Sequence, residues 1–307
     1  MKVTVVGSGF VGQTTAMRLV QRGIGEIVLI DIVQGLPQGL ALDMREASPI
    51  ERFEPDITGT NDYGDTAGSD VVVITAGFPR QPGMSRMDLL ERNAGIIRSV
   101  VEQVVPGSPN AILINVTNPL DEMTHLASEV SGFPKQRVVG MAGVLDGARL
   151  RYFIAEQLDV SPLVVEAMTL GSHGESMVAL PRHATVDGKP LPELVDEATL
   201  ERLYARTRDA GAEIVSLLKK GSAYYAPSAA VTAMVSAIGN NTPDVLPVCA
   251  WVTGQYGIRD VYVGVPVRLS GEGVTEIVEL DLNDEEVTAL RDAAEGIRAK
   301  CADLSKL

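Results

Sequence analysis

Three side chains in this sequence have the types and spacing of a proton-transfer site that binds an anion. His173 stands between glycines in the segment 171–174, directly after a predicted strand, and the glycines leave room for a small molecule against the imidazole. Asp146 and Arg149 lie three positions apart at the start of a predicted helix, so both project from nearly the same face. An imidazole that donates a proton needs a carboxylate to fix its tautomer, and a guanidinium binds a carboxylate with two parallel hydrogen bonds. The three residues therefore predict acid/base chemistry on a carboxylate.

The remaining histidines and the cysteines are more typical of structural positions. His125 falls in a predicted helix and His183 in a predicted strand or loop. Cys249 and Cys301 are far apart in the chain and have no further cysteines to pair with, which predicts two buried thiols. We therefore expect no metal site.

A glycine-rich turn, Gly7-Ser8-Gly9-Phe10-Val11-Gly12, follows the first predicted strand and opens the first predicted helix. Such a turn needs Gly7 for its tight bend, Gly9 for close approach of backbone N–H groups to a pyrophosphate, and Gly12 for packing of helix on strand. The positive end of the following helix dipole favours the same anion. The motif predicts a dinucleotide site.

Asp31 ends the second predicted strand, where a carboxylate can accept hydrogen bonds from both ribose hydroxyls. The same charge repels a 2′-phosphate, and neither Ile32 nor Val33 supplies a cation to hold one. The sequence therefore favours NAD over NADP.

The elements that must position these residues fall into two patterns. In the first half, apolar runs at 2–6, 26–31, 70–75 and 111–115 alternate with helical patterns at 10–21 and 87–105. Apolar strands separated by helices are typical of a doubly wound parallel α/β sheet, the Rossmann class. The second half reads as α+β, with helices at 148–157 and 193–218, a strand at 163–170, a hairpin at 185–190, mixed strands at 260–280 and a C-terminal helix opened by Asn283 and Glu286.

Length and charge narrow the function classes. A chain of 307 residues exceeds the roughly 250 at which one core stops growing, so we expect a cofactor domain at 1–144 and a catalytic substrate domain at 145–307. The net charge of −14 opposes nucleic-acid binding. No apolar run approaches the ~20 residues of a membrane span, and no signal peptide precedes the first strand, which predicts a cytoplasmic protein.

Six ordered motifs together resemble the lactate/malate dehydrogenase superfamily, and within it the malate dehydrogenases of the lactate-dehydrogenase-like group. The resemblance extends from Met1 to the C-terminal helix. The motifs are the glycine turn with Asp31, Thr75-Ala76-Gly77, the loop 79–86, Val116-Thr117-Asn118-Pro119, and the segments around Asp146 and His173.

The resemblance implies a role for each of these residues. His173 would be the acid/base, Asp146 its carboxylate partner and Arg149 the clamp on the substrate's C1 carboxylate. Arg86, in a loop that closes over the site, would polarise the C2 carbonyl, and Asn118 would contact the nicotinamide and the substrate oxygen. The implied cofactor-binding residues are Gly7, Ser8, Gly9, Phe10, Val11, Gly12, Asp31, Thr75, Ala76, Gly77, Asn93, Val116 and Asn118, and the small residues Ser222 and Ala223 would line the substrate pocket.

The substrate depends on one position of the loop. In the family, the residue six places before the carbonyl-polarising arginine selects between a second carboxylate and a methyl group, and here it is Arg80, which would pair with the C4 carboxylate of oxaloacetate. A shift of one residue would place Gln81 there instead, so lactate dehydrogenase remains an alternative. A catalytically silent NAD-binding sensor is a second alternative, although a pure binder needs neither His173 nor Arg149. The resemblance also implies a homo-oligomer, either a dimer or a tetramer built from two dimers, of which the tetramer is the expected form.

Overall fold

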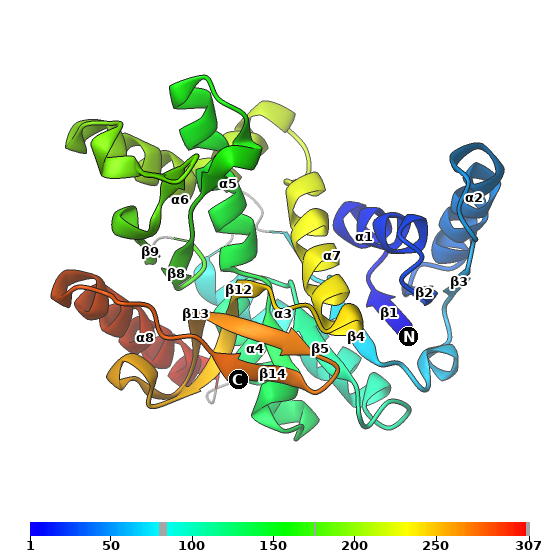
Figure 1. Cartoon of the computed structure of the whole chain (residues 1–307). Coiled ribbons are helices and arrows are strands. Elements are labelled where there is room, and N and C mark those ends of the chain that lie inside the picture. The colour runs from blue at the N-terminus through cyan, green and yellow to red at the C-terminus, as the bar shows by residue number, and fades with distance from the viewer. Residues whose placement is uncertain (80–84, 175, 305–307) are drawn as a thin grey trace.

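One mixed sheet of eleven strands runs through both halves of the protein in the computed structural model (Figure 1), which describes residues 1–79, 85–174 and 176–304. Its first six strands are parallel and lie in the order β3-β2-β1-β4-β5-β6. This is the strand order of a dinucleotide-binding doubly wound sheet. The strands are β1 (Lys2–Val6), β2 (Glu26–Ile30), β3 (Ile57–Thr60), β4 (Val71–Ile74), β5 (Ile112–Asn115) and β6 (Val138–Gly140).

Antiparallel strands of the second half continue the same sheet. β12 (Val245–Thr253) pairs with β6 at one position, Cys249 opposite Gly140, and then along its length with β13 (Arg259–Ser270). β13 in turn pairs with β8 (Thr169–Gly171) and β14 (Gly273–Ile277), and β8 with β9 (Met177–Ala179). A separate small sheet contains β7 (Val165–Glu166), β10 (Thr185–Val186) and β11 (Lys189–Pro190). The predicted fold class, a Rossmann sheet followed by an α+β part, is confirmed.

Eight α-helices within the described residues cover these strands (Figure 1). Figure 1 shows α7 between α1 on one side and the pair α5 and α6 on the other. The helices are α1 (Phe10–Gln21), α2 (Leu36–Glu51), α3 (Arg86–Val104), α4 (Leu120–Ser131), α5 (Gly143–Leu158), α6 (Glu197–Leu218), α7 (Tyr225–Asn240) and α8 (Asp284–Leu304).

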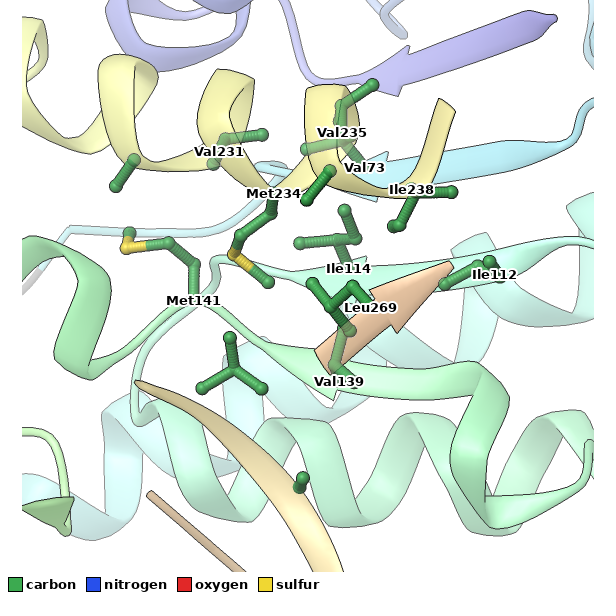
Figure 2. Close-up of a cluster of buried hydrophobic side chains, with 14 of the residues drawn as sticks. Val73, Ile112, Ile114, Val139, Met141, Val231, Met234, Val235, Ile238 and Leu269 are labelled. Carbon is green, nitrogen blue, oxygen red and sulfur yellow. The ribbon is translucent and has the colours of Figure 1, made fainter. Parts of the chain in front are cut away.

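Helix α7 belongs to the second half of the chain but covers the parallel sheet of the first. Figure 2 shows Met234 and Val235 of α7 directed toward Val73 and Ile114 on β4 and β5. All four side chains are fully buried in one cluster. Burial of such a side chain stabilises the fold by roughly 1.5–3 kcal/mol. Helix α7 therefore contributes substantially to the hydrophobic core on one face of the parallel strands.

Several local predictions are confirmed. The hairpin at 185–190 turns through Asp187 and Gly188, whose φ angles of 49° and 76° are those of a two-residue turn with both central residues left-handed. The C-terminal helix opens with the expected capping box, in which Glu286 N donates to Asn283 Oδ1 at 2.8 Å and Asn283 N donates to Glu286 Oε2 at 2.9 Å.

Other local predictions are wrong or incomplete. The predicted strand 163–170 is a 3-10 turn, Pro162–Val164, followed by β7 and β8, because its two ends pair with different sheets. The predicted helix at 148 begins at Gly143, and the one at 193 begins at Glu197, where Asp196 Oδ1 caps the Thr199 amide at 2.8 Å. Helix α2 was not among the predicted elements. Pro37 lies in its first turn, where the N–H has no helical partner, whereas Pro49 lies inside the helix and removes one i→i−4 hydrogen bond.

Candidate active site

His173 lies in the turn after β8, and the conformation of this turn depends on glycines. Gly171 has a φ of +81°, and a Cβ on the facing Gly264 would lie 2.4 Å from the Gly171 carbonyl oxygen. Larger residues would force β8 and β13 apart at this pair. The chain therefore leaves the sheet edge at a fixed point, two residues before the histidine.

One carboxylate holds the imidazole and the guanidinium together. Asp146 Oδ2 lies 2.7 Å from His173 Nδ1, and Asp146 Oδ1 accepts from Arg149 Nη1 at 3.3 Å. The side chains of His173, Asp146 and Arg149 are only 17%, 6% and 12% exposed. Because Nδ1 faces Asp146, the opposite ring nitrogen, Nε2, is the one that can meet a substrate. The structure thus brings together the three residues with which the sequence analysis began.

The surroundings favour a protonated imidazole. Burial alone would lower the pKa of His173, but the charge and hydrogen bond of Asp146, with a smaller contribution from Asp121, raise it above the ordinary value. Burial lowers the pKa of Arg149, and Asp146 offsets part of that effect. The Arg149 Nε is buried without a hydrogen-bond partner in the described part of the chain, so this guanidinium retains donor capacity for an anion.

The glycine-rich turn has the shape that a pyrophosphate requires. A Cβ on Gly12 would lie 1.8 Å from the Gly7 carbonyl oxygen, whereas a Cβ on Gly9 would meet nothing within 4 Å. Gly12 is therefore needed for packing, and Gly9 faces open space at the N-terminus of α1. Thr75 Oγ1 holds the turn from the neighbouring strand by donating to the Gly7 carbonyl at 3.0 Å. The residues present fit a dinucleotide.

Asp31 is fixed next to this turn. Its Oδ2 accepts from the Ser8 amide at 2.6 Å and its Oδ1 from the Val33 amide at 3.0 Å. Ile32 is 86% exposed and Val33 53% exposed, so apolar side chains and no cation flank the carboxylate on its C-terminal side.

Asn93 ties together two of the predicted cofactor segments. The buried amide accepts from the Phe78 amide at 2.7 Å and donates to the Asn118 carbonyl at 2.6 Å. Thr117 Oγ1 adds a hydrogen bond to the Ala76 carbonyl at 2.7 Å. These bonds hold the segments 75–78 and 116–119 side by side, with Asn118 itself exposed. In this structure Asn93 therefore supports the two cofactor segments, and a direct cofactor contact stays a prediction.

The loop between α6 and α7 lies beside the glycine-rich turn. The Tyr224 ring stacks on Phe10 with centroids 5.2 Å apart, and a Cβ on Gly221 would lie 3.9 Å from the Phe10 ring. Ser222 and Ala223 belong to this loop, with Ser222 exposed. Arg80, and the side chain of Arg86 at the start of α3, lie outside the described residues.

Two family models match the two halves of the chain that form this site. The model for the lactate/malate dehydrogenase NAD binding domain matches residues 1–140, and the model for the lactate/malate dehydrogenase alpha/beta C-terminal domain matches residues 143–306. The chain belongs to the lactate/malate dehydrogenase family. The resemblance inferred from the six motifs and the predicted NAD cofactor are thereby confirmed.

Individual members of the lactate/malate dehydrogenase family match over almost the whole chain. A malate dehydrogenase from Roseiflexus sp. (strain RS-1) is 51% identical over 306 residues, covering 100% of this chain and 99% of its own. The structure of a malate dehydrogenase from Salinibacter ruber has a TM-score of 0.95 at 49% identity, covering 100% of this chain and 98% of that one. The structure of a lactate dehydrogenase from Cryptosporidium parvum, complexed with lactic acid and nicotinamide adenine dinucleotide, has a TM-score of 0.96 at 38% identity, covering 100% and 98%.

The sequence analysis missed one buried residue that contacts the turn carrying His173. Asp121, in the first turn of α4, accepts a hydrogen bond from Ser172 Oγ at 2.6 Å and from the His173 amide at 3.2 Å. Its signal was present, because an acidic residue closely follows the Val116–Pro119 motif. Its contact with a turn 51 residues away could not be inferred from spacing.

The described residues contain neither a cluster of metal ligands nor a membrane-spanning helix. Within residues 1–79, 85–174 and 176–304, no three histidine, cysteine, aspartate or glutamate side chains lie together as metal ligands. No helix in that part of the chain is both long and apolar enough to cross a bilayer.

Proposed function

We propose that this protein is an NAD-dependent malate dehydrogenase that interconverts (S)-malate and oxaloacetate. The observation that carries the proposal is the single carboxylate, Asp146, that contacts both His173 Nδ1 and Arg149 Nη1. This arrangement places a proton donor beside an anion-binding guanidinium in a largely buried site. A silent NAD-binding protein needs no such pair.

The proposed mechanism follows from the geometry of these side chains. Arg149 binds the C1 carboxylate of the substrate and so sets the C2 carbonyl within reach of His173 Nε2. The protonated imidazole gives its proton to the oxygen at C2, and Asp146 stabilises the imidazolium before transfer. In malate oxidation the neutral imidazole takes the same proton back. Arg86 is proposed to polarise the C2 oxygen, and Asn118 to contact both the nicotinamide edge and the substrate oxygen.

Bound NAD would supply the hydride donor or acceptor for C2. The glycine-rich turn, residues 7–12, is proposed to bind its pyrophosphate, and Asp31 its adenosine ribose. Thr75, Ala76, Gly77 and Val116 border the same edge of the sheet as Asn118 and are proposed to line the nicotinamide end. We also propose that Ser222 and Ala223 close the substrate pocket from the α6–α7 loop.

Substrate choice is proposed to rest on Arg80, which would pair with the C4 carboxylate of oxaloacetate. The relatives at about half identity that carry the name malate dehydrogenase support this choice. The similarity to a lactate dehydrogenase structure keeps pyruvate as the second candidate substrate.

Oxidation of NADH, followed by its near-ultraviolet absorbance, tests the proposal directly. We expect rapid oxidation with oxaloacetate and an efficiency lower by several powers of ten with pyruvate, because pyruvate offers the Arg80 guanidinium no second carboxylate. Faster turnover of pyruvate would make the protein a lactate dehydrogenase. If NADH is oxidised with neither acid, the remaining hypothesis is a catalytically silent NAD-binding sensor.

Asp31→Asn should weaken the preference for NADH over NADPH. The substitution removes the charge that repels a 2′-phosphate and weakens the hydrogen bonds to the ribose, so we expect the ratio of kcat/KM values to fall by about 10- to 100-fold. Steady-state kinetics with both cofactors measure it. Asp43→Asn, an exposed position on α2, should leave the ratio unchanged, and equal ratios in the two variants would remove Asp31 from cofactor selection.

Organisation beyond the site is also proposed. We assign residues 1–144 to an NAD-binding domain and residues 145–307 to a catalytic substrate domain, a division supported by family models that meet near residue 141. We further propose a homotetramer, dimer of dimers, located in the cytoplasm. Light scattering of the purified protein would determine the number of subunits.

A further inference from the structure

We propose that Asp121 is a second positioning carboxylate of the reaction, which fixes His173 through its backbone and stabilises the protonated imidazole. This inference rests on the proposed function, in which His173 transfers the proton. Asp121 itself touches neither substrate nor cofactor in the proposal. It acts through the histidine.

The contacts of Asp121 join the two parts of the site. Its Oδ2 accepts from Ser172 Oγ at 2.6 Å and from the His173 amide at 3.2 Å, and the side chain is almost fully buried. Asp121 follows Asn118 by three residues, at the start of α4. The segment proposed to contact the nicotinamide is therefore tied to the turn that carries the acid/base.

Two carboxylates thus restrain one histidine at different points. Asp146 holds the imidazole at Nδ1 with a distance of 2.7 Å, which sets the tautomer and the ring orientation. Asp121 holds the main-chain nitrogen of the same residue, which sets the point from which the side chain starts. With only one of these restraints, the ring nitrogen that faces the substrate could shift, and a displacement of about 1 Å can cost 10²-fold in rate.

The position of Asp121 is unfavourable for stability alone. Burial, and to a smaller extent the charge of Glu122, raises the pKa of Asp121 to about 6, even though hydrogen bonds from Ser172 and the Cys249 thiol and the charge of His173 lower it. Its second oxygen, Oδ1, receives no N–H or O–H donor from the described residues. A neutral amide side chain could accept the hydrogen bonds from Ser172 and the His173 amide without the desolvation of a charge. A carboxylate is therefore unexpected here unless its charge acts on a neighbour.

The charge of Asp121 acts on His173. It is one of the effects that raise the pKa of the imidazole, after those of Asp146. The ionisable groups around the pair come from four elements. Asp146 and Arg149 on α5 face His173, and Glu122 on α4, Cys249 on β12 and Cys301 on α8 lie near Asp121.

Asp121→Asn separates the charge from the geometry, because the amide oxygen can still accept from Ser172 and the His173 backbone. NMR titration of the imidazole signals in the ligand-free protein should show a lower midpoint for His173 in this variant than in the unaltered protein. The chain has only three histidines, and the signal lost in His173→Asn identifies the one to follow. An unchanged midpoint would refute the electrostatic role.

Glu129→Gln is the matched control for this titration. Glu129 lies on the same helix, is 56% exposed and contacts His125 at 3.2 Å. Removing its charge should leave the His173 midpoint where it was. An equal shift in both variants would show that any charge lost from α4 has the same effect, and would overturn the assignment to Asp121.

Kinetics and melting test the positioning role. Asp121→Asn should retain turnover at its own optimum, with the alkaline limb of oxaloacetate reduction moved to lower pH, and at pH 8 it should melt no lower than the unaltered protein. Asp121→Ala removes the acceptor as well, so its kcat should fall by about tenfold or more with the KM for NADH within about twofold. Full activity of the alanine variant, or a destabilised asparagine variant with an unmoved pH limb, would overturn the proposal.

Turnover of the unaltered protein and the titration of His173 distinguish a failure of the proposed function from a failure of this inference. If the unaltered protein oxidises NADH with neither oxaloacetate nor pyruvate, the proposed function fails, while the titration still decides whether Asp121 acts on His173. If the unaltered protein is active and the two Asp121 variants behave like Glu129→Gln, only the inference fails.

Discussion

His173→Asn should reduce kcat for oxaloacetate reduction by about 10²–10⁴-fold, the usual contribution of a positioned general acid. Asparagine has no group that gives a proton to the C2 oxygen, although it can still hydrogen-bond to Asp146. NADH should bind with unchanged affinity, because the glycine-rich turn and Asp31 lie on other elements. Stopped-flow turnover and NADH fluorescence measure the two quantities separately.

The pH dependence provides a further check on the same variant. Reduction of oxaloacetate needs the protonated imidazole, and the pKa of His173 is raised, so the unaltered enzyme should lose rate only as the pH rises above the ordinary histidine range. This limb should disappear in His173→Asn. His183→Asn is the control, since His183 contacts the Asp281 carbonyl and should not affect turnover. A fully active His173→Asn protein would remove His173 from the mechanism.

Arg80→Gln should reverse much of the preference for oxaloacetate. A charge-assisted hydrogen bond to the C4 carboxylate contributes about 1.5–3 kcal/mol, and pyruvate no longer leaves a guanidinium unpaired. We therefore expect the ratio of kcat/KM for oxaloacetate over pyruvate to fall by about 10²–10⁴-fold. Steady-state assays with both keto acids measure this ratio.

Gln81→Ala tests the register of the loop. If Arg80 faces the substrate, Gln81→Ala should leave the ratio close to that of the unaltered protein. The opposite pattern, a large effect at Gln81 with oxaloacetate preference intact in Arg80→Gln, would place the amide in the selecting position and favour the lactate dehydrogenase alternative.

Motifs that depend on short-range geometry could be predicted from the sequence. The glycine-rich turn, the Asp187–Gly188 hairpin and the Asn283 capping box each require particular residues within a few positions, and each is present as expected. The Asp146 carboxylate accepts a hydrogen bond from the Arg149 guanidinium because the two residues are one helical turn apart.

Contacts between distant segments were beyond the sequence. Nothing in the run 163–170 indicates that β7 and β8 pair with different sheets. The pairing of β6 with β12, at Gly140 and Cys249, joins segments more than a hundred residues apart. The bond between Asp121 and Ser172 is of the same kind. Such contacts depend on the whole topology, which periodicity and local propensity do not encode.

The burial of Val73 and Ile114 beneath α7 bears on how this enzyme can evolve. A gene fragment that encodes only the nucleotide half would keep α1 and α2 but lose α7, so the apolar side chains of β4 and β5 would be more exposed to water. Recombination that exchanges this half for another lineage's would have to carry a matching α7, encoded more than eighty residues downstream of the junction. Inheritance of the two halves is thus coupled by packing as well as by the active site, to which both halves are proposed to contribute.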